Sequence, residues 1–213
     1  SNYIYSFFYK MNPYILDVMR SNRLNSGNIS LLRSCIFVHI PKCAGNTIKD
    51  CVGGFGQDSH SKAKEIPKDF FDNFYSFSFV RNPWDRCLSA YYYLFKGGAR
   101  NSQDFIDREE FVINYPNFYD FLIKGGLDRA ASNQTHFIPQ VRFLEHRSFN
   151  FIGKVENIKK DMEIVCKNLK IECDLPHFNR SIRPSPSSYT PKMADVISRV
   201  YQEDIEEFGF SYK

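Results

Sequence analysis

The stretch that decides the fold reads Ile36-Phe37-Val38-His39-Ile40-Pro41-Lys42-Cys43-Ala44-Gly45-Asn46-Thr47. An apolar run of β-branched and aromatic residues ends at Pro41, and small residues then lead to Asn46 and Thr47. This order predicts a buried strand, a tight loop and the first turn of a helix. Such a turn presents unpaired backbone N–H groups and the positive end of the helix dipole to an anion, and Lys42 adds a full charge. An ordinary strand-to-helix turn with a surface lysine is the alternative, and this stretch alone does not separate the two.

The length and composition of the chain predict a single α/β domain over residues 1–213. Hydrophobic residues make up 43% of the sequence, which is enough for a packed core. The aromatic-rich residues 1–33 are expected to form an N-terminal extension packed on that core. The formal net charge of +4 suits an anionic ligand and is too small for a nucleic-acid binder.

The six cysteines contain no Cys-x-x-Cys pair and no matching histidine spacing, which argues against a zinc site. We interpret them as reduced, structural thiols of a cytoplasmic protein. No stretch has the apolar length of a bilayer span, and the first residues show no signal-peptide pattern. Because the sequence begins Ser1-Asn2 without a methionine, the alternative is a protein of the Golgi lumen whose N-terminal anchor has been removed.

A second strand–turn–helix unit follows the first. Residues 74–80 are an aromatic run of strand length that ends at Arg81. Asn82 is a good helix N-cap, Pro83 stands at the favoured first helical position, and Asp85 falls in the first turn, where a negative charge suits the dipole. We expect this helix to continue to Gly97-Gly98.

The rest of the chain alternates helical and strand patterns. Residues 97–110 are polar and charged, and are expected to be a mobile loop over an active site. The other expected elements are loops at 22–30 and 172–189, a strand at 149–155, and helices at 118–123, 135–144, 158–169 and 191–209. This alternation predicts a three-layer α/β sandwich with a mostly parallel central sheet and ligands at the carboxyl ends of its strands.

Two anion-directed features therefore follow two neighbouring strands. One is the Lys42 loop, and the other is Arg81 with Ser89 two turns into the next helix. A ligand with two separated anionic groups would suit this layout. Taken singly, Arg81 is better explained as a surface charge closing a strand, and Ser89 as a helix-packing residue.

Together the motifs resemble those of sulfotransferases that use 3′-phosphoadenosine 5′-phosphosulfate (PAPS), and most closely the branch that acts on carbohydrate hydroxyls, both Golgi-type and bacterial. Residues 39–47 resemble the 5′-phosphosulfate loop of that family, and residues 77–91 resemble its 3′-phosphate motif. The likeness extends to residues 151–157 and to the ending at 201–210, and so covers the chain from about Ile36 onward. The resemblance implies a sulfotransferase fold similar to that of P-loop NTPases.

The resemblance also implies a set of nucleotide contacts. The backbone of Lys42, Cys43, Ala44, Gly45, Asn46 and Thr47, with the Thr47 hydroxyl, would hold the 5′-phosphosulfate. Arg81 and Ser89 would hold the 3′-phosphate, which stays on the product 3′-phosphoadenosine 5′-phosphate (PAP). Ser181 and Arg183 are further candidates that would close over the nucleotide.

No metal is expected. The loop is not a Walker A motif, because its lysine precedes the glycine and no Gly-Lys-Ser/Thr follows. The strand at 74–80 ends in Arg81 rather than in an acidic metal ligand. A P-loop-like nucleoside or sugar kinase and an inactive PAP-binding module are the alternative functions.

The chemistry that the resemblance implies is in-line displacement at sulfur by an acceptor hydroxyl, which needs stabilisation of the leaving oxygen and a base for the hydroxyl proton. Lys42 is placed to stabilise charge on the leaving oxygen, and a histidine is the natural base. Among the histidines (His39, His60, His136, His146 and His177) we choose His60, which lies where related enzymes place a proposed base. His136 is second, and with Gln140 and Arg142 it is expected to shape the acceptor pocket. A carbohydrate hydroxyl is the expected acceptor, by resemblance alone.

Overall fold

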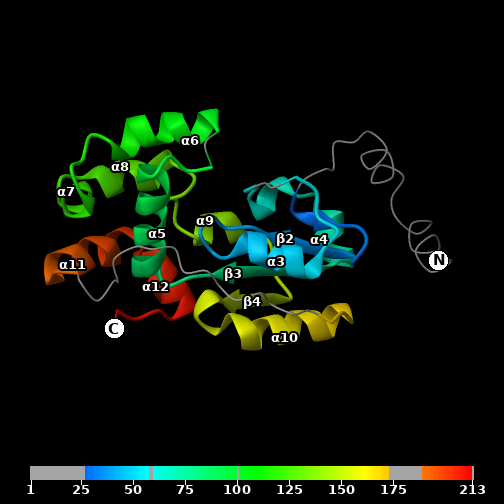
Figure 1. The fold of residues 1–213 in the computed structure, drawn as a ribbon. Helices are drawn as coiled ribbons and strands as arrows, with labels where there is room; N and C mark the ends of the chain where they lie inside the picture. Colours follow the sequence, from blue (N-terminus) through cyan, green and yellow to red (C-terminus); the bar gives the residue numbers. More distant parts are fainter. Residues whose placement is uncertain (1–26, 58–59, 100, 173–188, 213) are drawn as a thin grey trace.

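The computed structural model describes residues 27–57, 60–99, 101–172 and 189–212 (Figure 1). A four-stranded sheet lies at its centre, in the order β1 (Ile29–Ser30), β2 (Cys35–Val38), β3 (Tyr75–Val80), β4 (Phe151–Lys154). β1 is antiparallel to β2, whereas β2, β3 and β4 are parallel to one another. The prediction of a mostly parallel sheet is confirmed.

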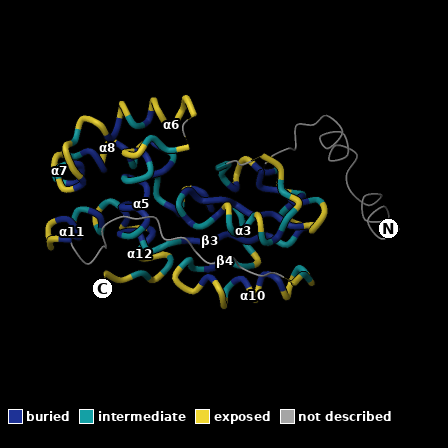
Figure 2. The backbone as a smooth tube through the Cα atoms, viewed as in Figure 1, coloured by how far each residue is buried: buried dark blue, intermediate teal, exposed yellow. Residues whose placement is uncertain are grey.

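The side chains of the sheet alternate between its two faces. Phe37, Phe77 and Phe79 pack with α3 (Gly45–Val52) and α10 (Ile158–Leu169) on one face. Ile36, Val38 and Val80 contribute to a second cluster with α4 (Lys68–Asn73) and α9 (Val141–Leu144). Both faces are covered, as a parallel sheet requires, and the central strands β2 and β3 are almost wholly buried, as Figure 2 shows for β3. The predicted three-layer sandwich is therefore present.

A separate helical group stands beside the sheet (Figure 1). Its hydrophobic cluster is centred on Trp84, Tyr91 and Phe121, which are all buried. Its helices are α5 (Pro83–Phe95), α6 (Ser102–Asp107), α7 (Phe118–Ile123), α8 (Gly126–Asn133) and α11 (Pro191–Val200), with the π-helical turn η2 (Arg108–Val112). α5 leads directly from β3 into this group and so joins the two halves.

The second strand–turn–helix unit forms as predicted. The Asn82 side chain accepts hydrogen bonds from the backbone N–H groups of Trp84 and Asp85, and Pro83 is the first residue of α5. α3 ends at Val52 because Gly53 adopts φ +74°, a left-handed conformation that favours glycine. α10 has the predicted bounds.

Four expectations about elements are wrong. Residues 97–110 are not a loop, because the Asn101 side chain caps α6 by accepting from the Asp104 N–H. Residues 22–30 are not wholly loop, since β1 pairs with β2. Only 141–144 of the helix expected at 135–144 is helical, and the preceding helix α8 was not expected. The last helix breaks at Tyr201 before α12 (Gln202–Phe208).

The cysteine expectation is correct in part. Cys35, Cys43, Cys87 and Cys166 are free and buried, whereas Cys51 is disulfide-bonded, which corrects the expectation that all thiols are reduced. Burial raises the pKa of Cys43 to about 12, so its thiol stays protonated.

Two further expectations fall outside the described residues. These are the packing of most of the N-terminal extension and most of the loop at 172–189, which includes Ser181 and Arg183. Within the described part of the chain, no helix combines the length and the apolar character that crossing a membrane would require.

Candidate active site

The loop after β2 has an unusual backbone. Lys42 and Ala44 adopt φ +68° and +62°, in the left-handed region that costs a non-glycine residue about 1–2 kcal/mol. Cys43 between them is buried, and its N–H donates to the carbonyl of Ile40. The two left-handed residues turn the chain sharply enough for α3 to begin at Gly45, immediately beyond the strand.

The first turn of α3 is left without protein acceptors of the usual kind. Ala44 is its N-cap and has no side chain that could accept from the helix, and no acidic residue lies in the first turn. The leading N–H groups of a helix have no intrahelical acceptor. This end of α3 therefore has the donors and the dipole that an anionic group requires.

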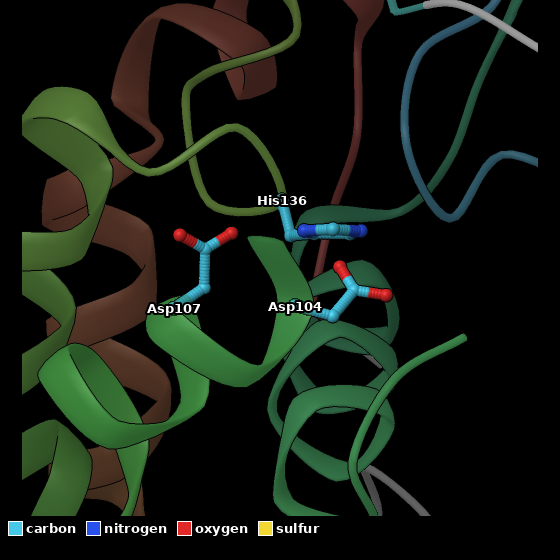
Figure 3. A group of neighbouring side chains, drawn as sticks. All are labelled: Asp104, Asp107 and His136. Atoms are coloured by element: carbon cyan, nitrogen blue, oxygen red, sulfur yellow. The ribbon is translucent and has the colours of Figure 1, made fainter. Parts of the chain in front are cut away.

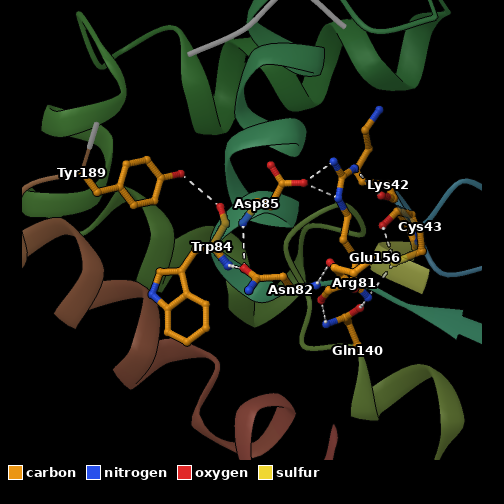
Figure 4. Close-up of polar contacts among 10 residues, drawn as sticks. Lys42, Cys43, Arg81, Asn82, Trp84, Asp85, Gln140, Glu156 and Tyr189 are labelled. Carbon is orange, nitrogen blue, oxygen red and sulfur yellow. Dashed lines mark hydrogen bonds and ion pairs between the residues drawn. The ribbon is translucent and has the colours of Figure 1, made fainter. Parts of the chain in front are cut away.

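Two arginines hold the carbonyls of the loop. The Arg81 guanidinium donates from Nη1 to the Lys42 carbonyl at 2.9 Å, and the buried Arg86 donates from Nε to the Pro41 carbonyl at 3.1 Å. Arg81 also forms an ion pair with Asp85, to which its Nε donates at 2.7 Å (Figure 4). Because the carbonyls point toward cations, the loop presents less negative charge to an anion at the start of α3.

Gln140 joins the ends of β2 and β3. Its Oε1 accepts from the Arg81 N–H at 2.8 Å and lies 3.3 Å from the Cys43 thiol, while its Nε2 donates to the Arg81 carbonyl at 2.9 Å (Figure 4). Asp204 in turn accepts from the backbone N–H groups of Gln140 and Val141. The side chain of Gln140 is fully buried, so it supports the loop rather than shaping an acceptor pocket.

Arg142 is also not placed as expected. It pairs with Glu145 and Glu203, and its side chain is 45% exposed. It is a surface ion-pair residue, whose contribution to stability is small.

One face of α5 runs along the loop. Asp85, Ser89 and Tyr93 follow one another at intervals of four residues, and therefore share a helix face. At one end of this face Asp85 holds Arg81, and at the other the Lys42 ammonium lies 3.7 Å from the centroid of the Tyr93 ring. Ser89 lies between these two contacts, which is compatible with its predicted place beside Arg81.

The cation–π contact fixes where Lys42 points. The ring face attracts the ammonium group, and the Tyr93 hydroxyl donates to Asp104 Oδ2 at 2.7 Å, so the ring itself is held. Neither Tyr93 nor Asp104 was singled out from the sequence. The four-residue spacing from Ser89 is the signal that could have found Tyr93.

Three histidines gather next to Lys42. The centroids of the His39 and His60 rings are 4.5 Å apart, and those of the His60 and His136 rings are 6.0 Å apart. The centroid of the Tyr93 ring lies 5.0 Å from that of His136. The polar segment that carries His60 therefore returns to the end of β2, as the choice of His60 requires.

The tautomer of His60 follows from one hydrogen bond. Its Nδ1 lies 3.0 Å from the carbonyl oxygen of His39, and a carbonyl only accepts. Nδ1 therefore carries a proton, and in the neutral ring the lone pair is on Nε2. A neutral His60 is thus prepared to accept a proton at Nε2.

His136 is more deeply buried than His60. The pKa of His136 is lowered to about 3, mainly by burial; the nearby His60 and Lys42 also lower it, while Asp104 opposes them. His136 is therefore neutral at physiological pH. Its role is distinct from that of a base that must take up a proton during turnover.

Asp104, Asp107 and His136 offer ligand atoms within 4.8 Å of one another (Figure 3). Several of their polar atoms already have hydrogen-bond donors in the protein, however. Asp104 Oδ2 accepts from Tyr93, the Ala99 N–H and Asn101, and both Asp107 oxygens accept from glutamine amides. Hydrogen bonds within the protein therefore account for the closeness of these three side chains, and the absence of a metal from the reaction stays a prediction.

Comparison with known families identifies the chain. The model of the sulfotransferase family matches residues 33–211. The chain belongs to the sulfotransferase family. A comparison with curated proteins finds no match. Membership in this family implies sulfuryl transfer from a PAPS-type donor to a hydroxyl group, and places the Lys42 loop and the Arg81 segment within the matched region.

A substitution at Gly45 tests the packing under the loop. A Cβ at this position would lie 1.9 Å from the His39 ring, so Gly45→Ala must displace either the imidazole or the start of α3. We expect a loss of about 1–3 kcal/mol in the free energy of unfolding in urea, together with weaker nucleotide binding. Asp50→Ala, at an exposed position of the same helix, is the control; equal urea midpoints for the two variants would contradict this packing.

The low pKa of His136 predicts a pH dependence of stability. Between the ordinary value of 6.5 and about 3, the unfolded chain binds a proton at this residue that the folded chain does not. Its contribution is therefore present above pH 6.5 and is lost as the pH falls through this window. Urea unfolding at pH 7.5, 5.5 and 4.5 should show a steeper loss for the wild type than for His136→Gln. His146→Asn, at an exposed position, is the control, and parallel curves for wild type and His136→Gln would refute the prediction.

Proposed function

We propose that the protein transfers the sulfuryl group of PAPS to an acceptor hydroxyl, with Lys42 at the leaving oxygen and His60 as the general base. The observation that carries this proposal is the convergence of the Lys42 ammonium and the His60 imidazole on His136. A cation and a proton acceptor at one point are what the reaction requires, since charge develops on the leaving oxygen while the attacking hydroxyl loses its proton.

The described residues suit a nucleotide with two separated anionic groups. The uncapped first turn of α3 and the loop backbone offer donors for the 5′-phosphosulfate. Arg81 uses three of its five N–H groups on Asp85 and the Lys42 carbonyl, and the remaining two can donate to the 3′-phosphate, beside Ser89. When bound, PAPS supplies a sulfuryl group attached to a phosphate leaving group.

The residues of the chain then have separate tasks. The acceptor oxygen forms a bond to sulfur as the bond from sulfur to the phosphate oxygen breaks. The hydroxyl proton passes to Nε2 of His60, and Lys42 stabilises the negative charge on the departing oxygen. PAP leaves with the bonding electrons, so the step needs no oxidant or reductant.

A carbohydrate hydroxyl is the acceptor class we propose. The support is the likeness of residues 39–47, 77–91 and 151–157 to the carbohydrate branch of the family. Screening glycans, phenols and small alcohols with radiolabelled PAPS tests this class directly. Transfer to phenols alone would overturn it.

The disulfide at Cys51 favours the second of the two locations considered from the sequence. Disulfides persist in oxidising compartments and are rare in the cytosol. We therefore propose that the protein works in an oxidising compartment such as the Golgi lumen. A free Cys51 thiol in protein isolated from its natural source, detected by alkylation, would refute this.

Variants of Lys42 and His60 test the mechanism. Lys42→Ala should lower the transfer rate by about 10²–10³-fold, because a preorganised charge at the leaving oxygen is lost. His60→Ala should lower it by about 10²–10⁴-fold and leave PAP binding nearly unchanged, since only the base is removed. EDTA in every assay should leave the wild-type rate unchanged.

The control for both variants is His146→Asn, which alters an exposed histidine. Full transfer activity in His60→Ala would remove His60 from the mechanism. Loss of PAP binding in His60→Ala would instead show that the segment around residue 60 holds the nucleotide.

The variant Arg81→Lys tests whether Arg81 binds the 3′-phosphate in addition to Asp85 and the Lys42 carbonyl. Lysine retains a charge but cannot bond Asp85, the Lys42 carbonyl and a phosphate at once. We expect PAP affinity to fall by roughly tenfold or more in calorimetric titration, with less effect on the affinity for adenosine 5′-phosphosulfate, which lacks the 3′-phosphate. Equal losses for the two nucleotides would contradict a 3′-phosphate contact.

A further inference from the structure

The side chain of Gln134 holds His136 in one tautomer. Its Oε1 accepts from the backbone N–H of His136 at 2.7 Å, and its Nε2 donates to Asp107 Oδ2 at 2.7 Å. A backbone N–H only donates and a carboxylate oxygen accepts, so both contacts assign the amide in the same sense. The Gln134 amide therefore has one orientation.

The same amide reaches the imidazole. Gln134 Nε2 lies 3.2 Å from His136 Nδ1. An amide nitrogen only donates, so Nδ1 of His136 must accept, and the proton of the neutral ring is on Nε2. His136 thus has the tautomer opposite to that of His60, whose Nδ1 donates to the His39 carbonyl.

This difference separates the tasks of the two rings. His60 has its lone pair on Nε2 and can take a proton. His136 has N–H on Nε2, and its Nδ1 is already used by an amide donor, so it offers a hydrogen-bond donor only. Such a donor does not serve the deprotonation of a hydroxyl. It complements an oxygen atom that bears negative charge.

We infer that His136 is a hydrogen-bond donor, through Nε2–H, to a sulfuryl oxygen of the bound donor, and that Gln134 and Asp107 are the positioning residues that set its tautomer. This inference rests on the proposed function. The charged and titratable groups that act on His136 are Lys42, His60, Arg86 and Asp104. The Lys42 ammonium lies over the Tyr93 ring, and the centroid of that ring is 5.0 Å from the centroid of the His136 ring. Lys42 and His136 are therefore neighbours. A neutral donor beside this ammonium adds hydrogen bonding without adding a second charge that would repel it.

The tautomer can be read directly by nitrogen NMR on protein labelled with ¹⁵N-histidine. His136→Gln removes one set of signals and so assigns it. We expect the His136 ring to show a protonated Nε2 and an unprotonated Nδ1 at pH 7. A protonated Nδ1, or a doubly protonated ring, would overturn the inference. This readout needs no substrate, so it stands even if the protein transfers no sulfate.

An exchange of polar groups tests the positioning residues. In the double variant Asp107→Asn/Gln134→Glu, every hydrogen bond keeps one donor and one acceptor, but the acceptor now faces His136 Nδ1. The ring should change to the Nδ1–H tautomer while the protein stays folded. The single variant Asp107→Asn is the mismatched control, because it places a new amide donor at position 107 against the Gln134 amide donor. An unchanged His136 tautomer in the double variant would overturn the role of Gln134.

The ligand contact is tested with PAPS and PAP, which differ by the sulfuryl group. In the double variant, the affinity for PAPS should fall by roughly tenfold, as expected for a lost hydrogen bond to a charged group, while the affinity for PAP stays the same. His136→Gln, which can donate through its amide but cannot take a proton, should retain more PAPS affinity than His136→Ala. Equal losses for PAPS and PAP would overturn the sulfuryl contact, whereas failure of the wild type to bind either nucleotide would overturn the proposed function itself.

Discussion

The hydrogen bonds of one buried amide tie the two halves of the site together. Gln140 pairs with both main-chain groups of Arg81 and contacts the Cys43 thiol, so the chain just beyond β3 is held against the loop that follows β2. Without a protein partner, these buried backbone groups would cost about 1–3 kcal/mol each. Asp204 anchors Gln140 from α12, which makes the C-terminal helix part of the support for the loop. The left-handed conformations of Lys42 and Ala44 persist because this network holds the residues on either side of them.

The network also sets the electrostatics of the site. Arg81 and Arg86 draw the loop carbonyls toward themselves, which leaves the first turn of α3 with its donors unopposed. Tyr93 holds the Lys42 ammonium at the opposite end of the same face of α5. The buried His136, on which Lys42 acts, stays neutral. A second cation at this position would be opposed both by burial and by Lys42.

Three histidines from separate parts of the sequence meet at the site, and each has a different role. His39 lies two residues before Pro41, yet its ring fills the space that a side chain at residue 45 would need, so its place is structural. His60 comes from a polar segment with little regular structure, and its hydrogen bond to the His39 carbonyl holds it at the same place. His136 enters from the helical group. The three rings share a location because β2, the segment after α3 and the turn before α9 all meet beyond the carboxyl end of the sheet, as ligand sites in parallel sheets do.

The sequence by itself determined the two strand–turn–helix units, since apolar runs, Asn82, Pro83 and the glycines after α3 act on neighbouring residues. It also determined the family, through motifs that follow those strands. It did not reveal α6, because the polar composition of this segment predicts a loop, although Asn101 is a usable helix-cap signal. Only the tertiary structure decided that Gln140 is a support, that Tyr93 orients Lys42, and that Gln134 sets the tautomer of His136. Most of these hydrogen bonds and ring contacts join residues that are distant in the chain, and Gln134 meets His136 in the turn that follows α8. A donor or acceptor acquires its role only when its partner is brought within about 3 Å.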